Sequence, residues 1–339
     1  MAPAPTRPTL PYCTVGTWPA FAHNGPFPFA LNIAMAHPSR IVFILHGRHC
    51  PQGLPDHLLA PLRADFDVDV LLTSSADSAT RYAREAALSG ARWVVAVGGD
   101  GTVHEVVNGL MSVPEAARQQ VALAVLPTGT GNDFARSLGS GNSVPDLLAL
   151  MAAGQVHALD LIRVTLADGS VRWCNNIGSI GITSDIVRRV KAMPARLPAS
   201  LAFYSAVSTA LLRWQPQPMQ LTLDGQRIDG RFTCVSAANG RFFGSGLGIA
   251  PEARLDDGLM EVVLIDNAGS LDFIRLLPQL RQAQRLADPR VRYLRGRVLQ
   301  VEGDAGRCPL ELDGELAGHA PVRFELVPGA LRCLRRLPA

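Results

Sequence analysis

Short apolar runs alternate with amphipathic stretches through the first half of the chain. The runs IVFIL, DVDVLLT, RWVVAVGG and VALAVLP, at residues 41–45, 67–73, 92–99 and 121–127, have the composition of buried strands. The stretches between them carry apolar residues at a spacing that lines one face of a helix. Strands alternating with helices predict a parallel sheet with helices on both faces and right-handed crossovers.

The pattern changes after Leu159. Short runs such as LDLIRVTL, MQLTLDG and LMEVVLID, several with alternating polarity, are separated by turns rich in Gly and Asp. This pattern is typical of an antiparallel, β-rich domain of sandwich or barrel type. Two helical stretches are expected to interrupt it, at about residues 183–214 and 270–287.

These patterns divide the chain into three parts. Residues 1–39, with eight prolines and no periodicity, are expected to form a loose extension, and Met35 is a second candidate for the start of translation. We expect an α/β nucleotide-binding domain at 40–158, completed by a returning segment at about 320–339, and a β-sandwich domain at 159–319. The length of 339 residues also favours two domains.

The charged residues exclude several functions. The net charge is +3, and Lys191, in the segment RRVKAMPAR, is the only lysine. Because no glycine-rich segment ends in Gly-Lys-Ser or Gly-Lys-Thr, a P-loop is excluded. A nearly neutral chain without an array of basic and aromatic residues also argues against nucleic-acid binding.

Cysteine placement and hydropathy indicate the compartment. The six cysteines form no Cys-x-x-Cys pair, and no basic segment followed by an apolar stretch marks a signal peptide. No run reaches the roughly 18 to 20 apolar residues of a membrane span, and residues 197–214 suit a buried or interfacial helix better. We therefore expect a protein of the reducing cytoplasm.

A glycine turn follows the third expected strand. Gly98-Gly99-Asp100-Gly101-Thr102 stands between a buried strand and a helix, at the carboxyl edge of the sheet, where ligands of such folds bind. Glycine amides and a helix N-terminus favour an anion such as phosphate, and Asp100 could hold Mg²⁺ or orient a hydroxyl. The alternative is a tight turn in which Asp100 caps the helix.

A second glycine turn follows the fourth expected strand. In LPTGTGNDFARSLG, residues 126–139, Asn132 or Asp133 is placed to cap a helix, and Phe134 to pack beneath it. The carboxyl ends of parallel strands share one edge, so both turns are expected to border the same crevice. Nucleotide binding is the simplest use of such a pair.

A third motif, Asp313-Gly314-Glu315, closes a late strand and by itself predicts a hairpin turn. Together, GGDGT, PTGTGNDFAR, APEARLDDGLMEV and LELDGE resemble the diacylglycerol kinase catalytic family, bacterial lipid kinases related to sphingosine kinases, in order and separation over residues 41–335. NAD kinases and phosphofructokinases share the GGDG turn, whereas NDFAR and the final DGE narrow the resemblance to the lipid kinases.

The resemblance implies an ATP-dependent kinase that uses Mg²⁺ to phosphorylate a hydroxyl of diacylglycerol or a similar glycerolipid or sphingoid alcohol. Glu315 matches the family's proton acceptor, and Asp100 would lie beside the transferring phosphoryl group and its Mg²⁺. Carbonyl oxygens of Arg254 and Leu259 and the carboxylate of Asp257 match a structural Mg²⁺ site. The residues that match the ATP-binding positions are Thr73, Gly98, Gly99, Asp100, Gly101, Thr102, Val103, His104, Thr130, Asn132 and Asp133.

The first loop departs from the family pattern. Residues 46–50 read HGRHC where the family has Asn-Pro-x-Ser-Gly. Arg48 or the rings of His46 and His49 could still meet a phosphate, and the alternative is that these histidines are loop residues without a catalytic role. His104 is expected on the surface of its helix, with only its backbone near the nucleotide.

Arginine-rich segments at residues 188–196 and 281–297 are expected to form solvated faces or, if both flank the cleft, to meet anionic headgroups at the inner face of the membrane. The expected partners are a lipid alcohol and a peripherally contacted membrane, without nucleic acid, and a homodimer is left open. Two alternatives remain: a kinase of a soluble substrate, similar to NAD kinase, and a nucleotide-binding, membrane-docking protein that has lost catalysis.

Overall fold

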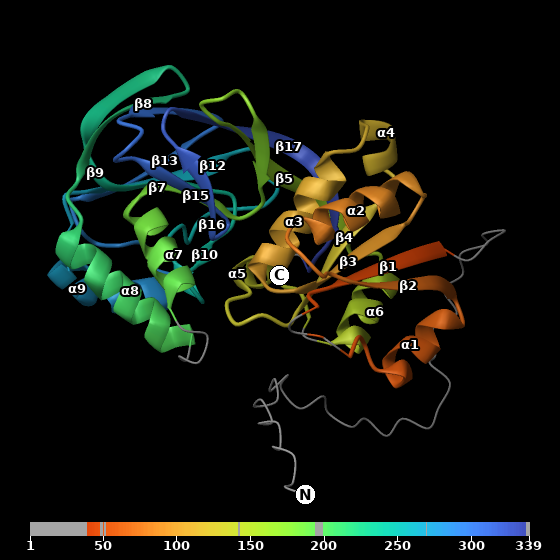
Figure 1. Ribbon diagram of the computed structural model, residues 1–339. Helices are drawn as coiled ribbons and strands as arrows, with labels where there is room; N and C mark the ends of the chain where they lie inside the picture. Colours follow the sequence, from red (N-terminus) through yellow and green to blue (C-terminus); the bar gives the residue numbers. More distant parts are fainter. Residues whose placement is uncertain are drawn as a thin grey trace, which may run out of the picture.

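The computed structural model describes residues 39–47, 50, 52–141, 143–193, 199–268 and 270–336 of the chain. An α/β part and a β-rich part lie next to each other (Figure 1), so the predicted fold class is confirmed. The extension expected at residues 1–39 lies outside the described residues, except for Ser39, which begins the first strand.

Parallel strands form the sheet of the α/β part: β1 (Ser39–Leu45), β2 (Phe66–Leu72), β3 (Trp93–Gly98) and β4 (Ala122–Pro127). They lie in the order β2-β1-β3-β4, and each falls where an apolar run predicted it. The central strands β1, β3 and β4 are buried at nearly every position. This burial explains their continuous apolar composition, because both faces of the sheet are covered.

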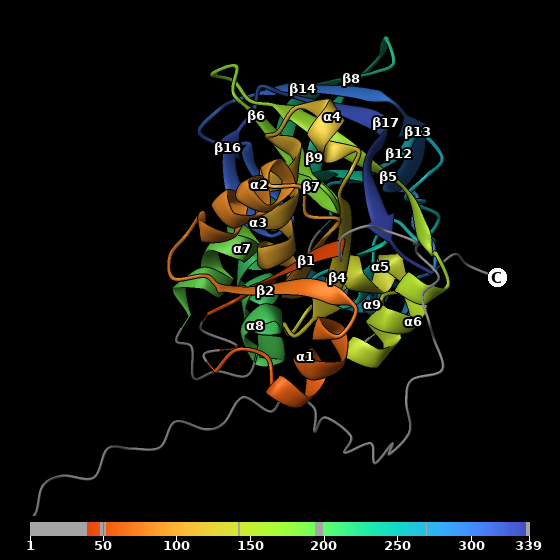
Figure 2. The same ribbon diagram turned by 90° about the vertical axis from the view of Figure 1, so that its right-hand side faces the viewer.

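Helices cover both faces of this sheet (Figure 2). The helices α2 (Ser78–Leu88) and α3 (Asp100–Met111) pack on one face, and α1 (Asp56–Arg63) and α6 (Val144–Ala152) on the other. Because side chains alternate along a strand, β3 directs Val94 and Ala96 towards α3, and Val95 and Val97 towards α6. Two short helices, α4 (Glu115–Arg118) and α5 (Asp133–Leu138), complete this part.

The β-rich part encloses a second apolar core between antiparallel strands. Its strands are β6 (Val171–Cys174), β7 (Ile177–Gly181), β8 (Gln217–Leu223), β9 (Gln226–Ala238), β12 (Met260–Asp266), β13 (Val291–Gly296), β14 (Val298–Gly303), β15 (Pro309–Leu312) and β16 (Glu315–His319), with the small pair β10 (Phe242–Phe243) and β11 (Leu247–Gly248). Within the described residues, no helix has the length and apolar character needed to cross a membrane.

Three helices, α7 (Ile182–Ala192), α8 (Ala199–Arg213) and α9 (Ser270–Arg281), lie together beside this core (Figure 1). The helical stretch expected at about 183–214 is present, but as two helices, α7 and α8. Met193 ends α7 in an extended conformation because it precedes Pro194, and proline disfavours a helical residue before it. The helix expected at 270–287 ends earlier, at Arg281.

Two long strands run through both parts of the molecule: β5 (Val156–Thr165) and β17 (Val322–Leu334). The strand β17 pairs with β14 in the β-rich part and runs parallel to β4 at Arg332 and Cys333. Along its length β17 also pairs with β5, which crosses the boundary expected at residue 158. That boundary stays a prediction, and the shared strand pair is one of the connections between the two parts.

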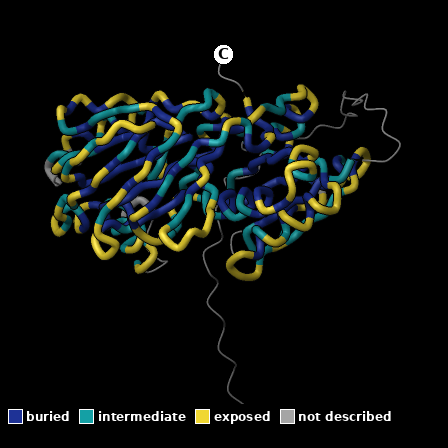
Figure 3. The backbone as a smooth tube through the Cα atoms, turned by 90° about the horizontal axis from the view of Figure 1, so that it is seen from above, coloured by how far each residue is buried: buried dark blue, intermediate teal, exposed yellow. Residues whose placement is uncertain are grey.

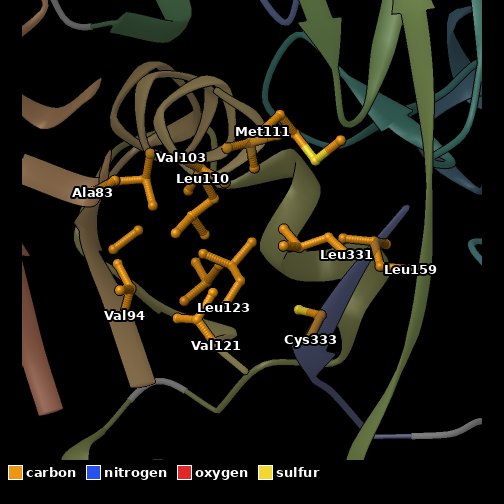
Figure 4. Close-up of a cluster of buried hydrophobic side chains, with 14 of the residues drawn as sticks. Ala83, Val94, Val103, Leu110, Met111, Val121, Leu123, Leu159, Leu331 and Cys333 are labelled. Carbon is orange, nitrogen blue, oxygen red and sulfur yellow. The ribbon is translucent and has the colours of Figure 1, made fainter. Parts of the chain in front are cut away.

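The buried interior follows this arrangement. Buried segments run through both parts (Figure 3), and the core of the α/β part includes side chains of the bridging strands (Figure 4). There Leu159 of β5 and Leu331 of β17 belong to the same cluster as Leu110 of α3 and Leu123 of β4. The bridge is therefore packed into the core of the α/β part rather than lying on its surface.

Candidate active site

The first glycine turn leaves the N-terminus of α3 open to an anion. Gly99 is the N-cap residue of α3, and no side chain caps that end of the helix. A Cβ atom on Gly98 would lie 2.3 Å from Oγ1 of Thr102, so the turn needs glycine there. The Thr102 hydroxyl is buried and has no hydrogen-bond partner among the described residues. A buried orphan donor at an uncapped helix N-terminus is suited to a phosphate.

The second glycine turn touches the first. A Cβ atom on Gly129 would lie 2.4 Å from the Cα of Gly99, and the Thr128 N–H donates to the carbonyl of Gly98 at 3.0 Å. The Thr128 hydroxyl is also buried without a partner among the described residues. The two turns are therefore in contact, as their places at the ends of β3 and β4 predicted.

Asp100 joins the two turns. Its Oδ1 and Oδ2 accept the N–H groups of Phe134 and Asp133, at 3.0 and 3.1 Å, so Asp100, the first residue of α3, caps α5. Burial raises the pKa of Asp100, and the two N–H donors oppose that rise. The expectation that Asn132 or Asp133 caps this helix is wrong, because the Asn132 side chain instead bonds to the backbone of Gly129.

Asp133 extends this network into the β-rich part. Its carboxylate accepts the N–H groups of Ser245 and Gly246, at 2.9 and 2.6 Å, in the turn between β10 and β11. Burial, followed by the nearby charge of Asp100, raises the pKa of Asp133 to about 6. Asp133 therefore connects the glycine turns to the β-rich part.

The remaining residues matched to ATP binding lie at different depths. Oγ1 of Thr73 accepts the N–H of Gly47 at 3.1 Å, which ties the end of β2 to the first loop. Thr130 is exposed at the tip of the second turn, whereas the Val103 side chain is in the apolar core and leaves only its backbone for a ligand. Arg48 and His49 of the first loop lie outside the described residues.

The Asp-Gly-Glu motif places a carboxylate against the first glycine turn. Asp313 and Gly314, with φ of 52° and 83°, form the two-residue turn of the β15–β16 hairpin, as predicted. Glu315 begins β16, and a Cβ atom on Gly101 would lie 3.4 Å from its Oε1. The structure therefore brings together Glu315 and the Gly98–Thr102 turn.

Lys191, on α7, forms an ion pair with Glu315. Both side chains are about half exposed, at 46% and 47%. Nothing in the local sequence around Lys191 signals this contact, because it depends on how α7 packs beside β16. Lys191 is far from the glycine turn in the sequence, and the structure brings this lysine to the edge of that turn through its pair with Glu315.

His104 is buried, so the expectation of a helix-surface residue is wrong. Its Nδ1 lies 2.7 Å from Oδ2 of Asp313, in a pair whose side chains are 8% and 1% exposed. Burial opposes a charge on His104, but the hydrogen bond and the charge of Asp313 outweigh it and raise the pKa of His104. Burial also opposes a charge on Asp313, and its partners reverse that effect and lower its pKa.

The residues matched to a structural Mg²⁺ site lie on one turn before β12. Oδ1 of Asp257 accepts the N–H of Leu259 at 3.1 Å, and its Oδ2 pairs with Arg295. Arg254 pairs at 3.8 Å with Asp256, which also pairs with a second arginine. No group of three His, Cys, Asp or Glu side chains in the described part of the chain is placed to hold a metal ion.

A residue that sequence analysis missed organises the same turn. Asp160 of β5 accepts the N–H of Gly258 before β12 and the N–H of Gly329 in β17, both at 2.8 Å. Burial raises its pKa, and the charges of Asp257 and Asp256 add to that rise. Asp160 therefore fixes the turn that carries Asp257 to the bridge between the two parts.

An apolar cavity of about 90 Å³ opens between the three helices and the sheet of the β-rich part. Its walls include Phe203 and Val207 of α8 and Leu276 and Leu280 of α9, with Ile265 of β12. Its polar atoms come from Thr183, Thr233, Cys234 and Ser236. The helix α7 leads from this cavity to Lys191, because its first turn contributes Thr183 and its last turn carries the lysine.

Family comparisons agree with this architecture. The family model described as "Diacylglycerol kinase catalytic domain" matches residues 47–164. The model described as "YegS C-terminal NAD kinase beta sandwich-like domain" matches residues 176–335. A Stenotrophomonas maltophilia (strain K279a) protein named "Probable lipid kinase YegS-like" is 32% identical over 273 residues, 80% of this chain and 87% of that protein. The chain belongs to the YegS-like lipid kinase family.

Two further proteins are similar to most of this chain. A protein of Mycobacterium tuberculosis (strain ATCC 25618 / H37Rv) named "Diacylglycerol kinase" is 29% identical over 275 residues, 79% of this chain and 85% of that protein. A crystal structure of a diacylglycerol kinase from Bacillus anthracis str. Sterne shares the fold, with a TM-score of 0.65 and 21% identity over 89% of this chain and 98% of that one. The resemblance found from the motifs is confirmed, and the protein is a kinase.

Proposed function

We propose that the protein transfers the γ-phosphoryl group of ATP to the hydroxyl of a lipid such as diacylglycerol, with Glu315 as the general base. The observation that carries this proposal is the position of Glu315, from the β-rich part: its Oε1 lies 3.4 Å from where a Cβ atom on Gly101 would stand, beside the glycine turn at the N-terminus of α3. It puts a half-exposed carboxylate at the edge of a site suited to phosphate.

The residues present fit the phosphates of ATP, which supplies the transferred phosphoryl group when bound. Glycine backbone at Gly99 and Gly129 would surround the phosphates, together with the hydroxyls of Thr102 and Thr128, which have no partner within the described part of the chain. Glu315 would take the proton of the acceptor hydroxyl as its oxygen bonds to the γ-phosphorus and the bond to the departing ADP breaks. A general base of this kind typically contributes about 10²- to 10⁴-fold to the rate.

The apolar cavity supports a lipid as the acceptor. Its walls are aliphatic and aromatic, and α7 connects it to the Lys191–Glu315 pair. A hydrocarbon chain gains free energy in such a cavity, whereas a soluble acceptor such as NAD has no comparable apolar group to bury. A lipid acceptor also implies that the protein contacts a membrane peripherally, at its inner face if the protein is cytoplasmic.

Mg²⁺ at Arg254, Asp257 and Leu259 is part of this proposal. Oxygen ligands suit this hard cation, and Asp160 and Asp256 add negative charge near the turn. The Asp257 carboxylate is shared with Arg295, so binding there requires that ion pair to open.

A transfer assay with labelled ATP tests the proposal. Diacylglycerol, monoacylglycerol, phosphatidylglycerol and sphingosine, each in mixed micelles or vesicles, are offered beside NAD. We expect a labelled lipid and no labelled NADP, and a loss of about 10²- to 10⁴-fold in kcat for Glu315→Gln with ATP affinity retained.

The matched control is Glu302→Gln, on an exposed position of β14, which should leave kcat unchanged. Near-normal turnover by Glu315→Gln would remove Glu315 from the mechanism. Phosphorylation of NAD in the absence of lipid would favour the soluble-substrate alternative instead.

A further inference from the structure

A buried ion pair connects the helix that begins at the glycine turn with the hairpin that carries Glu315. His104 lies in the first turns of α3, and Asp313 lies two residues before Glu315. The two residues are 209 positions apart in the sequence, yet Nδ1 and Oδ2 are 2.7 Å apart. The pair therefore spans the two parts of the molecule directly behind the site.

We propose that His104 and Asp313 are positioning residues, whose buried contact sets where Glu315 stands relative to the phosphate-binding turn. This inference rests on the function proposed above, in which Glu315 is the base. It assigns neither residue a contact with substrate.

The hairpin side of this contact is held firmly. Asp313 accepts the N–H groups of Asn175, Asn176 and Ile177 at 2.9 to 3.1 Å, and the thiol of Cys174 at 3.1 Å. These bonds tie the β15–β16 turn to the segment between β6 and β7. His104 connects the hairpin, and the segment bonded to it, to α3.

A second side chain on the same face of α3 strengthens the attachment. Asn108, one turn after His104, accepts the N–H of Trp173 and donates to its carbonyl, both at 2.9 Å. Residues four apart on a helix share a face. His104 therefore contacts the hairpin, and Asn108 bonds to the neighbouring β6 strand from the same face of α3. A shift of α3 would therefore carry the hairpin, and with it Glu315.

The ring of His104 is not free to act on the nucleotide. Its Nδ1 is committed to Asp313, its Nε2 lies 3.4 Å from the Asn108 amide nitrogen, and the side chain is 8% exposed. Its influence on the reaction must therefore pass through Asp313 and the hairpin. A displacement of a reacting group by about 1 Å can lower a rate by about 10²-fold, so a small shift suffices.

His104→Ala and His104→Asn test this role by steady-state kinetics with saturating lipid. Alanine removes the contact, whereas asparagine places a neutral amide near the position of Nδ1. We expect kcat to fall at least about tenfold in His104→Ala and to recover most of that loss in His104→Asn, with KM for ATP within about twofold of wild type in both. His157→Ala, which removes a half-buried histidine of β5 that bonds to Gln155 away from the site, is the control and should match wild type.

Hydrogen exchange by mass spectrometry gives a readout that does not depend on activity. In His104→Ala, peptides covering residues 310–318 should exchange faster, while peptides of β1, β3 and β4 keep their wild-type protection. His104→Asn should restore the protection of residues 310–318.

The outcomes separate the two proposals. Unchanged kcat in His104→Ala, a parallel loss of ATP affinity, or faster exchange throughout the chain would each overturn the positioning role. If wild type phosphorylates no lipid, the proposed function fails. In that case the exchange of residues 310–318 still decides whether the contact positions the hairpin.

Discussion

Gly129→Ala is expected to force the two glycine turns apart. An alanine Cβ at this position would lie 2.4 Å from the Cα of Gly99 and 3.0 Å from its N. Since carbon atoms in contact lie about 3.5 to 4.0 Å apart, the opposing backbone must move by about 1 Å. The obstructing atoms belong to backbone and cannot rotate away as a side chain could. Overpacking of this kind typically costs about 1 to 3 kcal/mol.

The same displacement should weaken ATP binding, because both turns are proposed to surround the phosphates. A loss of about 1 to 3 kcal/mol of binding free energy corresponds to a roughly 5- to 150-fold lower affinity. Isothermal titration calorimetry with ATP measures this loss, and thermal unfolding shows whether the variant is folded. Gly306→Ala is the matched control, since its Cβ would meet only Oδ1 of Asp304, at 3.4 Å. If Gly129→Ala binds ATP within about twofold of Gly306→Ala, the turns do not act as one phosphate site.

Three further predictions concern pH, the ion pair and the metal. Burial raises the pKa of Glu311, in β15, from its ordinary value of 4.5 to about 8, so the folded state favours the protonated carboxyl. The folded state therefore loses stability as pH rises from 4.5 through 8. Glu311→Gln should therefore lose less thermal stability than wild type between pH 5 and 8.5, and parallel stability curves would contradict this. Lys191→Met should change the free energy of unfolding by less than about 1 kcal/mol, because half-exposed ion pairs contribute little to stability. A larger change, measured by denaturant unfolding, would assign Lys191 a structural role. Asp257→Ala should abolish Mg²⁺ binding measured by calorimetry, and equal binding by the two proteins would place the metal elsewhere.

Much of the α/β part could be predicted because its signals are local. The apolar runs of β1 to β4 reflect burial on both faces, and the glycines after β3 and β4 reflect the tight turns that follow. The Asp313-Gly314 turn was predictable for the same reason, since two adjacent residues with positive φ are enough to form it. Helix ends were less predictable: α7 ends before a proline, and the apolar pattern alone continues across that break.

The candidate site was predicted in part. Its two glycine turns were expected to meet, because parallel strands end at a common edge, and Gly99 and Gly129 do touch. The capping of α5 by Asp100 was not expected, because Asn132 and Asp133 are nearer in sequence and are equally suited to a cap. Only the contact between the two turns favours Asp100.

The sequence by itself determined the strands, most of the helices, the class of the fold and the motifs that resemble lipid kinases, since all of these depend on residues within a few positions of one another. The tertiary structure decided which distant groups meet: Glu315 with Gly101, Lys191 with Glu315, and His104 with Asp313. Helical periodicity could not distinguish a buried His104 from an exposed one. The difference lies in a hairpin 209 residues away, whose carboxylate supplies the partner that makes burial of the ring favourable.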